Sequence, residues 1–308
     1  MTTFGKATFD AAIYASARPT YPRQLYDFVF KYHERGASAR WDLALDLGCG
    51  TGQATHELTP FKRVIGVDPS ARMIERANQD IKESGLFDQG RLQFIQSPAE
   101  SLSFVEDGSV DLMVSAQAAH WFDWKMLWTE SARVLRKDGT LAAWGYSEFR
   151  VTDCPDATPL IHQYAQGTDP ENSLGPHWER PGRTIVDNHY LDIPHPSEVV
   201  PGKFSDFERV FFSGDHHPSL PSPRPVILRK TTTWAGLMAY LRSSSSLHNF
   251  HERYPTDLER PDGDIAVRFL RRLKEAVAKK QGKEGQELRD EEEVVIEWPL
   301  ALILARKA

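Results

Sequence analysis

Short apolar runs alternate with amphipathic stretches along the first half of the chain. The runs at residues 43–47, 64–67, 92–95, 110–115 and 140–146 predict five buried strands. Between Ser70 and Ser84, apolar residues recur at helical spacing with charged residues between them, which predicts a surface helix, and residues 124–136 predict a second. Gly139 is expected to end that second helix in a left-handed conformation. This alternation is typical of β-α-β units around a mostly parallel sheet.

The pattern changes after the fifth predicted strand. From Thr152 to Lys203, proline, histidine and aromatic residues are frequent, and helical spacing recurs only near residues 159–165 and 183–190, so we interpret this stretch as an inserted cap. The remaining sequence predicts a strand at 207–212, helices at 231–241 and 265–279, and a last strand at 294–305. We therefore expect the C-terminal part of the chain to complete the sheet.

Charge and cysteine content restrict the partners and the compartment. The formal net charge of −6 provides no global field that would attract nucleic acid or an anionic membrane surface. Two cysteines, Cys49 and Cys154, cannot form a disulfide framework, which fits a reducing compartment. The N-terminus lacks the pattern of a secretory signal, and the apolar run at 300–305 is far shorter than the ~20 residues that span a bilayer. These features predict a soluble cytoplasmic protein with neither a nucleic-acid nor a membrane partner.

Three alternate glycines directly follow the first predicted strand. Gly48, Gly50 and Gly52 would let the chain turn sharply and bring its backbone against a ligand. The motif is not a dinucleotide fingerprint, because Gln53 follows Gly52, and the Gly-Lys-Ser/Thr ending of a P-loop is absent. A tight strand-to-helix connection without a ligand is the structural alternative.

Two acidic residues mark the carboxyl ends of the first two strands. Asp68 ends the second strand, where a carboxylate can accept both hydroxyls of a ribose; alternatively it caps the helix that begins near Ser70. Asp46 ends the first strand. Because parallel strands end at the same edge of a sheet, both acids are expected at one crevice.

These motifs resemble those of the class I S-adenosylmethionine-dependent methyltransferases. The resemblance rests on the D-x-G-x-G-x-G loop at 46–52, on the acid that ends the second strand, and on the segment RVLRKDG at 133–139, and it spans residues 40 to 147. Outside that span, YASARPTYP at 14–22, AQAAHWFD at 116–123 and YLRSSSS at 240–246 look like the fungal trans-aconitate methyltransferase and cantharidin-resistance branch.

The resemblance implies an α/β, Rossmann-like fold with a seven-stranded, mostly parallel sheet, helices on both faces and an inserted cap. One methyltransferase domain would cover residues 1–308. It would comprise an N-terminal helical lid at 1–40, a cofactor-binding core at 41–147, a substrate cap at 148–205, and strands and helices at 206–308 that complete the sheet and pocket. The cofactor would be S-adenosyl-L-methionine, and the acceptor a small molecule, with a trans-aconitate-like carboxylic acid giving a methyl ester.

The resemblance also assigns cofactor contacts to positions in this sequence. The glycines would lie under the cofactor, Asp68 would hold its ribose, and Arg18 would pair with its carboxylate. Pro98 stands where related enzymes carry an aspartate for the adenine, so Ser97 and the backbone of Ala99 are the expected substitutes. The full predicted cofactor set is Tyr14, Arg18, Asp46, Gly48, Gly50, Gly52, Gln53, Asp68, Pro69, Ser97, Ala99, Glu100, Ala116 and Gln117.

The acceptor chemistry stays open at this stage. A carboxylate is already ionised at pH 7, so its methylation requires an anion-binding site more than a general base, and no metal. A phenol, thiol or amine would need a base, for which His120 is the candidate. The predicted substrate contacts are Tyr21, His120, Trp121, Trp144, Tyr146 and Arg242, and further pocket candidates are Arg150, Trp178, Arg180 and Arg183.

Two other functions remain as alternatives. One is methylation of oxygen, sulfur or nitrogen in a secondary metabolite. The other is a regulatory protein that binds the cofactor without turnover, for which Pro98 is a hint. Strand four is not followed by the Asn/Asp-Pro-Pro-aromatic loop of nucleic-acid amino-methylating enzymes, which agrees with the acidic composition. The protein could be a monomer or a homodimer.

Overall fold

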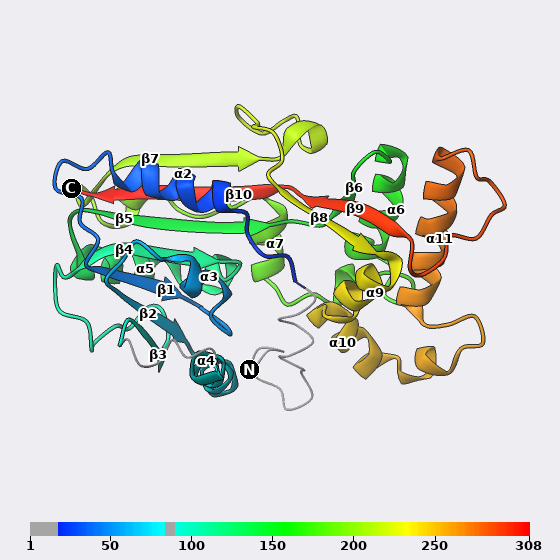
Figure 1. The fold of residues 1–308 in the computed structure, drawn as a ribbon, viewed down its shortest axis with the longest axis horizontal. Coiled ribbons are helices and arrows are strands. Elements are labelled where there is room, and N and C mark those ends of the chain that lie inside the picture. The colour runs from blue at the N-terminus through cyan, green and yellow to red at the C-terminus, as the bar shows by residue number, and fades with distance from the viewer. Residues whose placement is uncertain (1–17, 84–89) are drawn as a thin grey trace. The chain divides into compact units, whose positions relative to one another are not determined.

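The computed structural model describes residues 18–83 and 90–308, and within them the chain divides into two compact units (Figure 1). The large-sheet unit comprises residues 20–146, 184–227 and 300–308. The described part of the small-sheet unit comprises residues 18–19, 147–183 and 228–299. Each unit is built around its own sheet.

The large-sheet unit contains a seven-stranded sheet in the order β3-β2-β1-β4-β5-β10-β7. Strands β1 to β5 are parallel, and β10 is antiparallel to both β5 and β7. This mostly parallel, Rossmann-like sheet confirms the fold class expected from the sequence. Its strands are β1 (Leu43–Leu47), β2 (Arg63–Asp68), β3 (Leu92–Gln96), β4 (Val110–Ala116), β5 (Leu135–Tyr146), β7 (Phe204–Phe212) and β10 (Leu300–Lys307).

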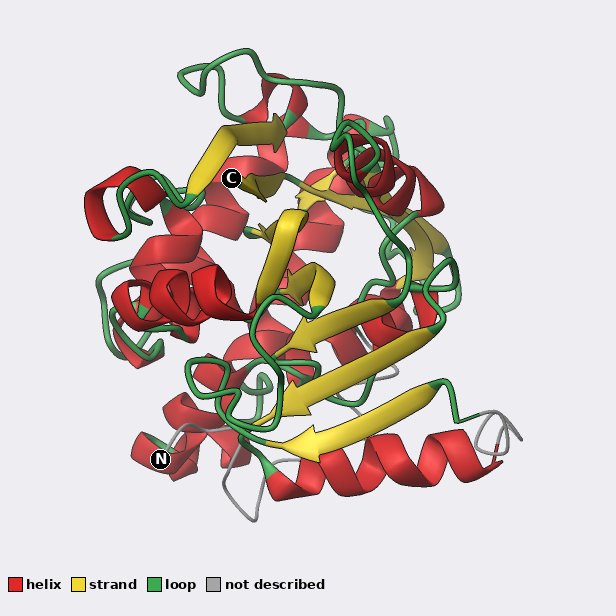
Figure 2. Ribbon diagram, turned by 90° about the vertical axis from the view of Figure 1, so that its left-hand side faces the viewer, coloured by secondary structure: helices red, strands yellow, loops and turns green. Residues whose placement is uncertain are grey.

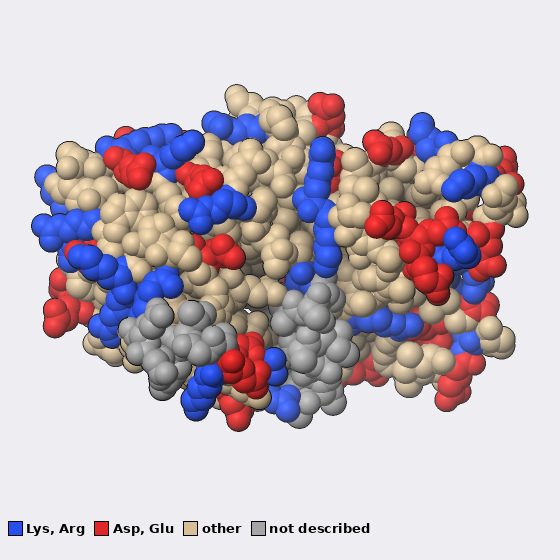
Figure 3. Space-filling view, in the orientation of Figure 1, with Lys and Arg blue, Asp and Glu red and all other residues tan. Residues whose placement is uncertain are grey.

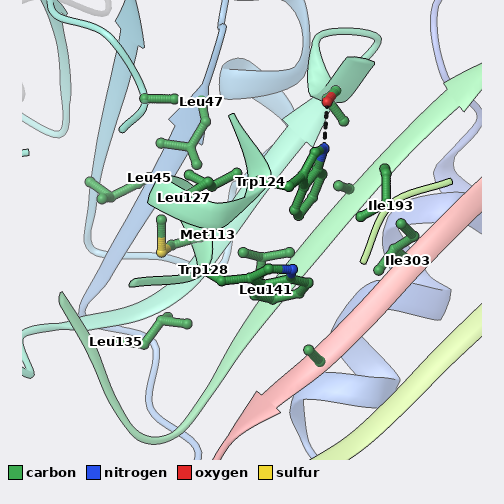
Figure 4. Packing of buried hydrophobic residues seen from close by; sticks show 14 of the residues in the cluster. Leu45, Leu47, Met113, Trp124, Leu127, Trp128, Leu135, Leu141, Ile193 and Ile303 are labelled. Carbon is green, nitrogen blue, oxygen red and sulfur yellow. Dashed lines mark hydrogen bonds between the residues drawn. The ribbon is translucent and has the colours of Figure 1, made fainter. Parts of the chain in front are cut away.

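Helices cover both faces of this sheet, and its strands twist progressively (Figure 2). Because side chains alternate along a strand, Leu45, Met113 and Leu141 face helix α5, where they pack with Trp124 and Trp128 (Figure 4). Helix α2 covers the opposite face. The helices of this unit are α2 (Arg23–His33), α3 (Gln53–Glu57), α4 (Ala71–Glu83), α5 (Trp124–Val134) and α8 (Pro196–Val199), and α7 (Gly182–Asp187) begins just before its second segment.

The described part of the small-sheet unit contains a three-stranded antiparallel sheet in the order β6-β9-β8 and four α-helices. Tyr164 of α6 stacks on Phe269 of α11 with ring centroids 4.0 Å apart, which fixes these two helices against each other. The elements are β6 (Arg150–Val151), β8 (Leu228–Thr233), β9 (Glu293–Trp298), α6 (Thr158–Gln166), α9 (Trp234–Arg242), α10 (Ser245–Arg253) and α11 (Ile265–Lys280).

The predicted last strand at 294–305 is wrong as a single element. Pro299 divides it into β9 and β10, which belong to different sheets. Proline lacks the N–H that a continuous ladder needs, so the strand is interrupted there. The helix predicted at 231–241 likewise begins only at Trp234, because Thr231–Thr233 belong to β8, where β-branched residues are favoured.

The start of the fifth strand also differs from the prediction, because β5 begins at Leu135, directly after α5. Helix α5 ends at Val134, and Asp138 rather than Gly139 has the left-handed conformation, with φ of 65°. Gly139 is instead a position of close approach, since a Cβ there would lie 2.8 Å from the carbonyl oxygen of Arg136.

The surface is mixed in charge. Lys and Arg side chains are interspersed with Asp and Glu on the face drawn in Figure 3. Among the described residues, no helix has the length and apolar character needed to cross a bilayer.

The cap that we expected at 148–205 differs from the observed division, because 184–227 belong to the large-sheet unit and 228–299 to the small-sheet unit.

Candidate active site

The glycine loop lies at the carboxyl end of β1 and is bonded to the end of β2. The Cys49 N–H donates to the Val67 carbonyl oxygen (2.9 Å), and the Gly50 N–H donates to Oδ2 of Asp68 (3.0 Å). Gly52 has φ of 92°, and a Cβ there would lie 2.6 Å from Cζ of Phe94. At Gly50, with φ of 55°, no described atom lies within 4 Å of the Cβ position. The loop is therefore tightly packed at Gly52 and open at Gly50, where a ligand can approach the backbone.

Asp68 is held by two backbone N–H groups. Its Oδ1 accepts from the Ser70 N–H (2.8 Å) and its Oδ2 from Gly50, so the alternative of a structural role just before α4 holds as well, although Ser70 itself is the N-cap residue of that helix. Each carboxylate oxygen has capacity for a second hydrogen bond. Burial raises the pKa of Asp68, although the two backbone N–H groups oppose that shift. A ribose diol would add donors to a carboxylate that is already held in place.

Asp46 is fully buried and has a free oxygen. Its Oδ2 accepts from the Thr55 hydroxyl (2.6 Å), whereas Oδ1 has no hydrogen-bond partner among the described residues. Burial raises its pKa to about 7; the Thr55 hydroxyl opposes this shift, and the charge of Asp68 adds to it. Two acids that repel each other at one crevice favour a cationic partner. The donor and acceptor set thus fits a cofactor that carries positive charge and a ribose.

The segment after β3 is held by its own hydrogen bonds. The Ser97 N–H donates to the Asp68 carbonyl oxygen (3.1 Å), and its hydroxyl donates to the Ser101 carbonyl oxygen (2.9 Å). Ala99 is buried. Oε1 of Glu100 accepts from the Asp123 N–H (2.9 Å), so this side chain connects the segment to the start of α5. Ser97 therefore lies directly beside Asp68, and the contact of this segment with the adenine stays a prediction.

Gln117 joins the carboxyl end of β4 to β5 through hydrogen bonds. It has a left-handed φ of 58°, its N–H donates to the Trp144 carbonyl oxygen (2.8 Å), and its side-chain amide makes two bonds to the Tyr146 backbone (2.7 and 3.0 Å). Both amide atoms of the Gln117 side chain are thus engaged within the protein. The Gln117 side chain therefore holds the carboxyl ends of β4 and β5 together.

Replacing Gln117 with alanine is expected to lower the free energy of unfolding by about 1–3 kcal/mol, because it leaves two buried backbone groups of Tyr146 without partners. Urea denaturation would measure this loss. Gln79→Ala is the control: Gln79 is exposed and bonds only to Glu83, so its loss should stay within about 0.5 kcal/mol. Equal stability of the two variants would contradict the role assigned to the Gln117 amide.

Aromatic side chains gather on the α2 face near the end of β5. Trp144 is fully buried, with the rings of Tyr21 and Tyr26 at 5.7 and 5.8 Å between centroids, and Tyr146 lies 6.3 Å from Tyr21. The Trp144 indole Nε1–H has no hydrogen-bond partner within residues 18–83 and 90–308. The predicted substrate residues Tyr21, Trp144 and Tyr146 are therefore neighbours, and an unused donor lies among them.

The other predicted site residues occupy varied positions. His120 and Trp121 share a short 3-10 helix after β4, with rings 4.8 Å apart. The Pro69 carbonyl accepts from Nε2 of Gln96 (3.1 Å), and Gln53 begins α3 directly after the glycine loop. Tyr14 lies outside the described residues.

The candidate arginines of the small-sheet unit have protein partners within that unit. Arg18 donates to the Ser243 carbonyl oxygen (3.2 Å) and lies over the ring of Tyr240, and Arg242 pairs with Asp264. Arg150 pairs with Glu148 at 3.0 Å, and Arg183 lies 4.1 Å from the ring of Trp178. Contacts of Arg18 and Arg242 with ligands stay predictions.

Four residues near the site were missed in the sequence. Phe94 packs against the glycine loop, Thr55 holds Asp46, Tyr26 contacts Trp144, and Tyr190 contacts Gly145. Tyr26 could have been found from the helical spacing of apolar residues at 25–32. The other three depend on contacts between separate elements and leave no local pattern.

Comparisons with known proteins agree with this geometry. A family model described as a methyltransferase domain matches residues 45–143, which include the glycine loop and both acids. The Saccharomyces cerevisiae protein named "Probable S-adenosylmethionine-dependent methyltransferase CRG1" is 31% identical over 282 residues, covering 89% of this chain and 90% of that protein. A Dictyostelium discoideum protein named as a methyltransferase is 30% identical, covering 75% of this chain and 77% of its own length.

A solved structure supports the same fold. The structure described as "a Putative Type II Methyltransferase from Anaeromyxobacter dehalogenans" has a TM-score of 0.63 and 25% identity, and the match covers 94% of this chain and 97% of that one. Its agreement extends along nearly the whole chain, beyond the part matched by the family model. The chain belongs to the class I S-adenosylmethionine-dependent methyltransferases.

Proposed function

We propose that this enzyme methylates a carboxylate of a small organic acid, of the trans-aconitate class, to give a methyl ester. The finer resemblance of residues 14–22, 116–123 and 240–246 supports this acceptor class. In the same proposal the cofactor lies on the loop Gly48–Gly52, with its ribose on Asp68 and its adenine beside Ser97 and Ala99. Asp46 then serves as the counter-charge for the cationic part of the cofactor.

For this reaction the protein mainly has to align the acceptor with the methyl group and to exclude water. When bound, the cofactor would supply a methyl group on a positively charged sulfur. The acceptor bonds to that methyl group in line with the methyl–sulfur bond, and the sulfur leaves as a neutral thioether. Asp46 and Asp68 would favour the charged cofactor, and the rings of Tyr21, Trp144 and Tyr146 would keep water from the acceptor. A carboxylate nucleophile has no proton to lose, so no residue needs to act as a base.

The unused indole N–H of Trp144 is the single observation that best supports an oxygen-bearing acceptor. A buried donor without a partner is unfavourable, and an acceptor carboxylate would satisfy it with a charge-assisted hydrogen bond. The flanking rings of Tyr21 and Tyr26 supply apolar walls around that donor. If the acceptor were a phenol, thiol or amine instead, His120 would be the candidate base.

Incubation with S-adenosylmethionine and a panel of acceptors tests the proposal. The panel contains trans-aconitate, other di- and tricarboxylic acids, and representative phenols, thiols and amines, and mass spectrometry detects the methylated product. We expect a product from a polycarboxylic acid that mild alkali hydrolyses, because esters are base-labile whereas methyl ethers, thioethers and amines are not. An alkali-stable product would assign the enzyme to O-, S- or N-methylation of another metabolite, and cofactor binding without any product would favour a regulatory protein.

A further inference from the structure

Tyr190 places a buried hydroxyl at the carboxyl end of β5. The residue is 1% exposed, and its ring packs in the apolar cluster with Val186, Ile193 and Phe211. Its Oη lies against Gly145 so closely that a Cβ on Gly145 would overlap it, and the same Cβ position lies 3.3 Å from Oε1 of Gln117. The hydroxyl thus adjoins the place where Gln117 joins β4 to β5.

This hydroxyl has no hydrogen-bond partner in the part of the chain that the structure describes. A buried hydroxyl without a partner is destabilising, and phenylalanine would fill the same space without that penalty. The nearby Oε1 of Gln117 accepts from the Tyr146 N–H, and the Tyr190 hydroxyl forms no hydrogen bond to it. Packing of the ring alone therefore gives no reason for tyrosine at this position.

The backbone that delivers Tyr190 is strained. His189 and Tyr190 both have left-handed conformations, with φ of 52° and 61°, directly after helix α7. Bulky residues rarely adopt this conformation, and such strain is concentrated at sites of function. Here it orients the Tyr190 ring so that its hydroxyl reaches Gly145.

The strand order indicates which ligand could use this hydroxyl. The glycine loop and the two acids follow β1 and β2, and the adenine-side segment follows β3. Tyr190 adjoins β5, which lies beyond β4 on the opposite side of the glycine loop. Tyr190 therefore lies at the β4–β5 part of this sheet edge, beside Gln117, and away from the β2–β3 part that holds Asp68 and Ser97; a methyl acceptor bound beyond the cofactor's ribose and adenine would meet the hydroxyl there.

We propose that the Tyr190 hydroxyl donates a hydrogen bond to an oxygen atom of the methyl acceptor and so positions it for transfer. This inference rests on the proposed function only in requiring an acceptor that carries oxygen. Burial raises the pKa of the Tyr190 hydroxyl, so it remains protonated and acts as a donor at neutral pH. In this proposal Tyr190 only donates a hydrogen bond and transfers no proton.

Tyr190→Phe tests the proposal, with three measurements on the full-length protein. These are kcat and KM for trans-aconitate, or for whichever panel compound the wild type methylates; the Kd for S-adenosylmethionine by calorimetry; and the Tm without ligands. We expect kcat/KM to fall about ten- to a hundredfold, as for the loss of a hydrogen bond to a charged group. The cofactor Kd should stay within about twofold, and the Tm should be equal to or above that of the wild type.

Tyr32→Phe is the matched control. Tyr32 is a buried tyrosine of the same unit, but its hydroxyl donates to the Asp206 carbonyl oxygen. Its loss should lower the Tm by about 2–4 °C without changing kcat/KM.

Three results would overturn the inference: an unchanged kcat/KM in Tyr190→Phe, a cofactor Kd weakened as much as kcat/KM, or a Tm loss like that of the Tyr32 variant. If the wild type does not methylate trans-aconitate but methylates another oxygen-bearing compound, the proposed acceptor fails and the Tyr190 inference is decided on that compound. If the wild type methylates nothing in the panel, the Tm decides: a Tyr190→Phe protein less stable than the wild type gives the hydroxyl a structural role.

Discussion

Asp68→Ala is expected to weaken S-adenosylmethionine binding at least tenfold, a loss of about 1.4 kcal/mol. The carboxylate ends β2 beside the open backbone at Gly50, and each of its oxygens can accept a further hydrogen bond from a ribose hydroxyl. Calorimetric titration with S-adenosylmethionine and with its demethylated product would measure the change. Both ligands carry the ribose, so both should lose affinity by a similar factor.

Two variants separate ribose binding from charge and folding. Asp80→Ala removes a surface carboxylate of α4 that pairs with Arg76 (2.7 Å), so it alters the net charge equally and should leave the cofactor Kd unchanged. Asp68→Asn keeps an oxygen that can accept from the Ser70 N–H and so preserves the helix start. Wild-type affinity in Asp68→Ala would show that this acid has only a structural role.

The strands around the cofactor loop could be predicted because their signals are local. A strand buried on both faces of a parallel sheet reads as a continuous apolar run, and the run at 43–47 coincides with β1. The division at Pro299 was missed although proline is a local signal, because the apolar pattern continues on both sides of it. Which sheet each half joins depends on partners far along the chain, β6 and β8 for one half and β5 and β7 for the other.

The site divides in the same way. Asp46 and the three glycines lie in one short motif at 46–52, and Asp68 ends the next apolar run. The sequence alone could therefore predict that these residues lie at one edge of the sheet. The binding of Tyr146 by Gln117 spans 29 positions, and the contact of Tyr190 with Gly145 joins residues still farther apart in the chain. A side chain that bonds to another backbone and one that binds a ligand look identical in a sequence, so the bonds of the Gln117 amide to Tyr146 could not be predicted; its contact with the cofactor stays a prediction.

Cofactor affinity is expected to depend on pH through Asp46. Its pKa of about 7 means that at pH 6 most molecules carry a neutral Asp46, which must lose its proton to face a cation. If only the ionised form binds, the apparent Kd scales as one plus the protonated-to-ionised ratio. Binding should then be about tenfold weaker at pH 6 than at pH 8 and should release a proton near neutral pH.

Asp46→Asn isolates this effect. The variant keeps an acceptor for the Thr55 hydroxyl but no titrating charge, so its affinity at pH 8 should be far more than tenfold below the wild type and should not change between pH 8 and pH 6. Folding supplies an independent check of sign: the folded pKa exceeds the ordinary value of 3.8, so the wild type binds more protons folded than unfolded and loses stability as the pH rises from about 4 to 7. The asparagine variant should lack that loss and be at least as stable at pH 8. If Asp46→Asn keeps the same pH dependence of binding, Asp46 is not the titrating group, and the effect belongs to Asp68, whose pKa is also raised.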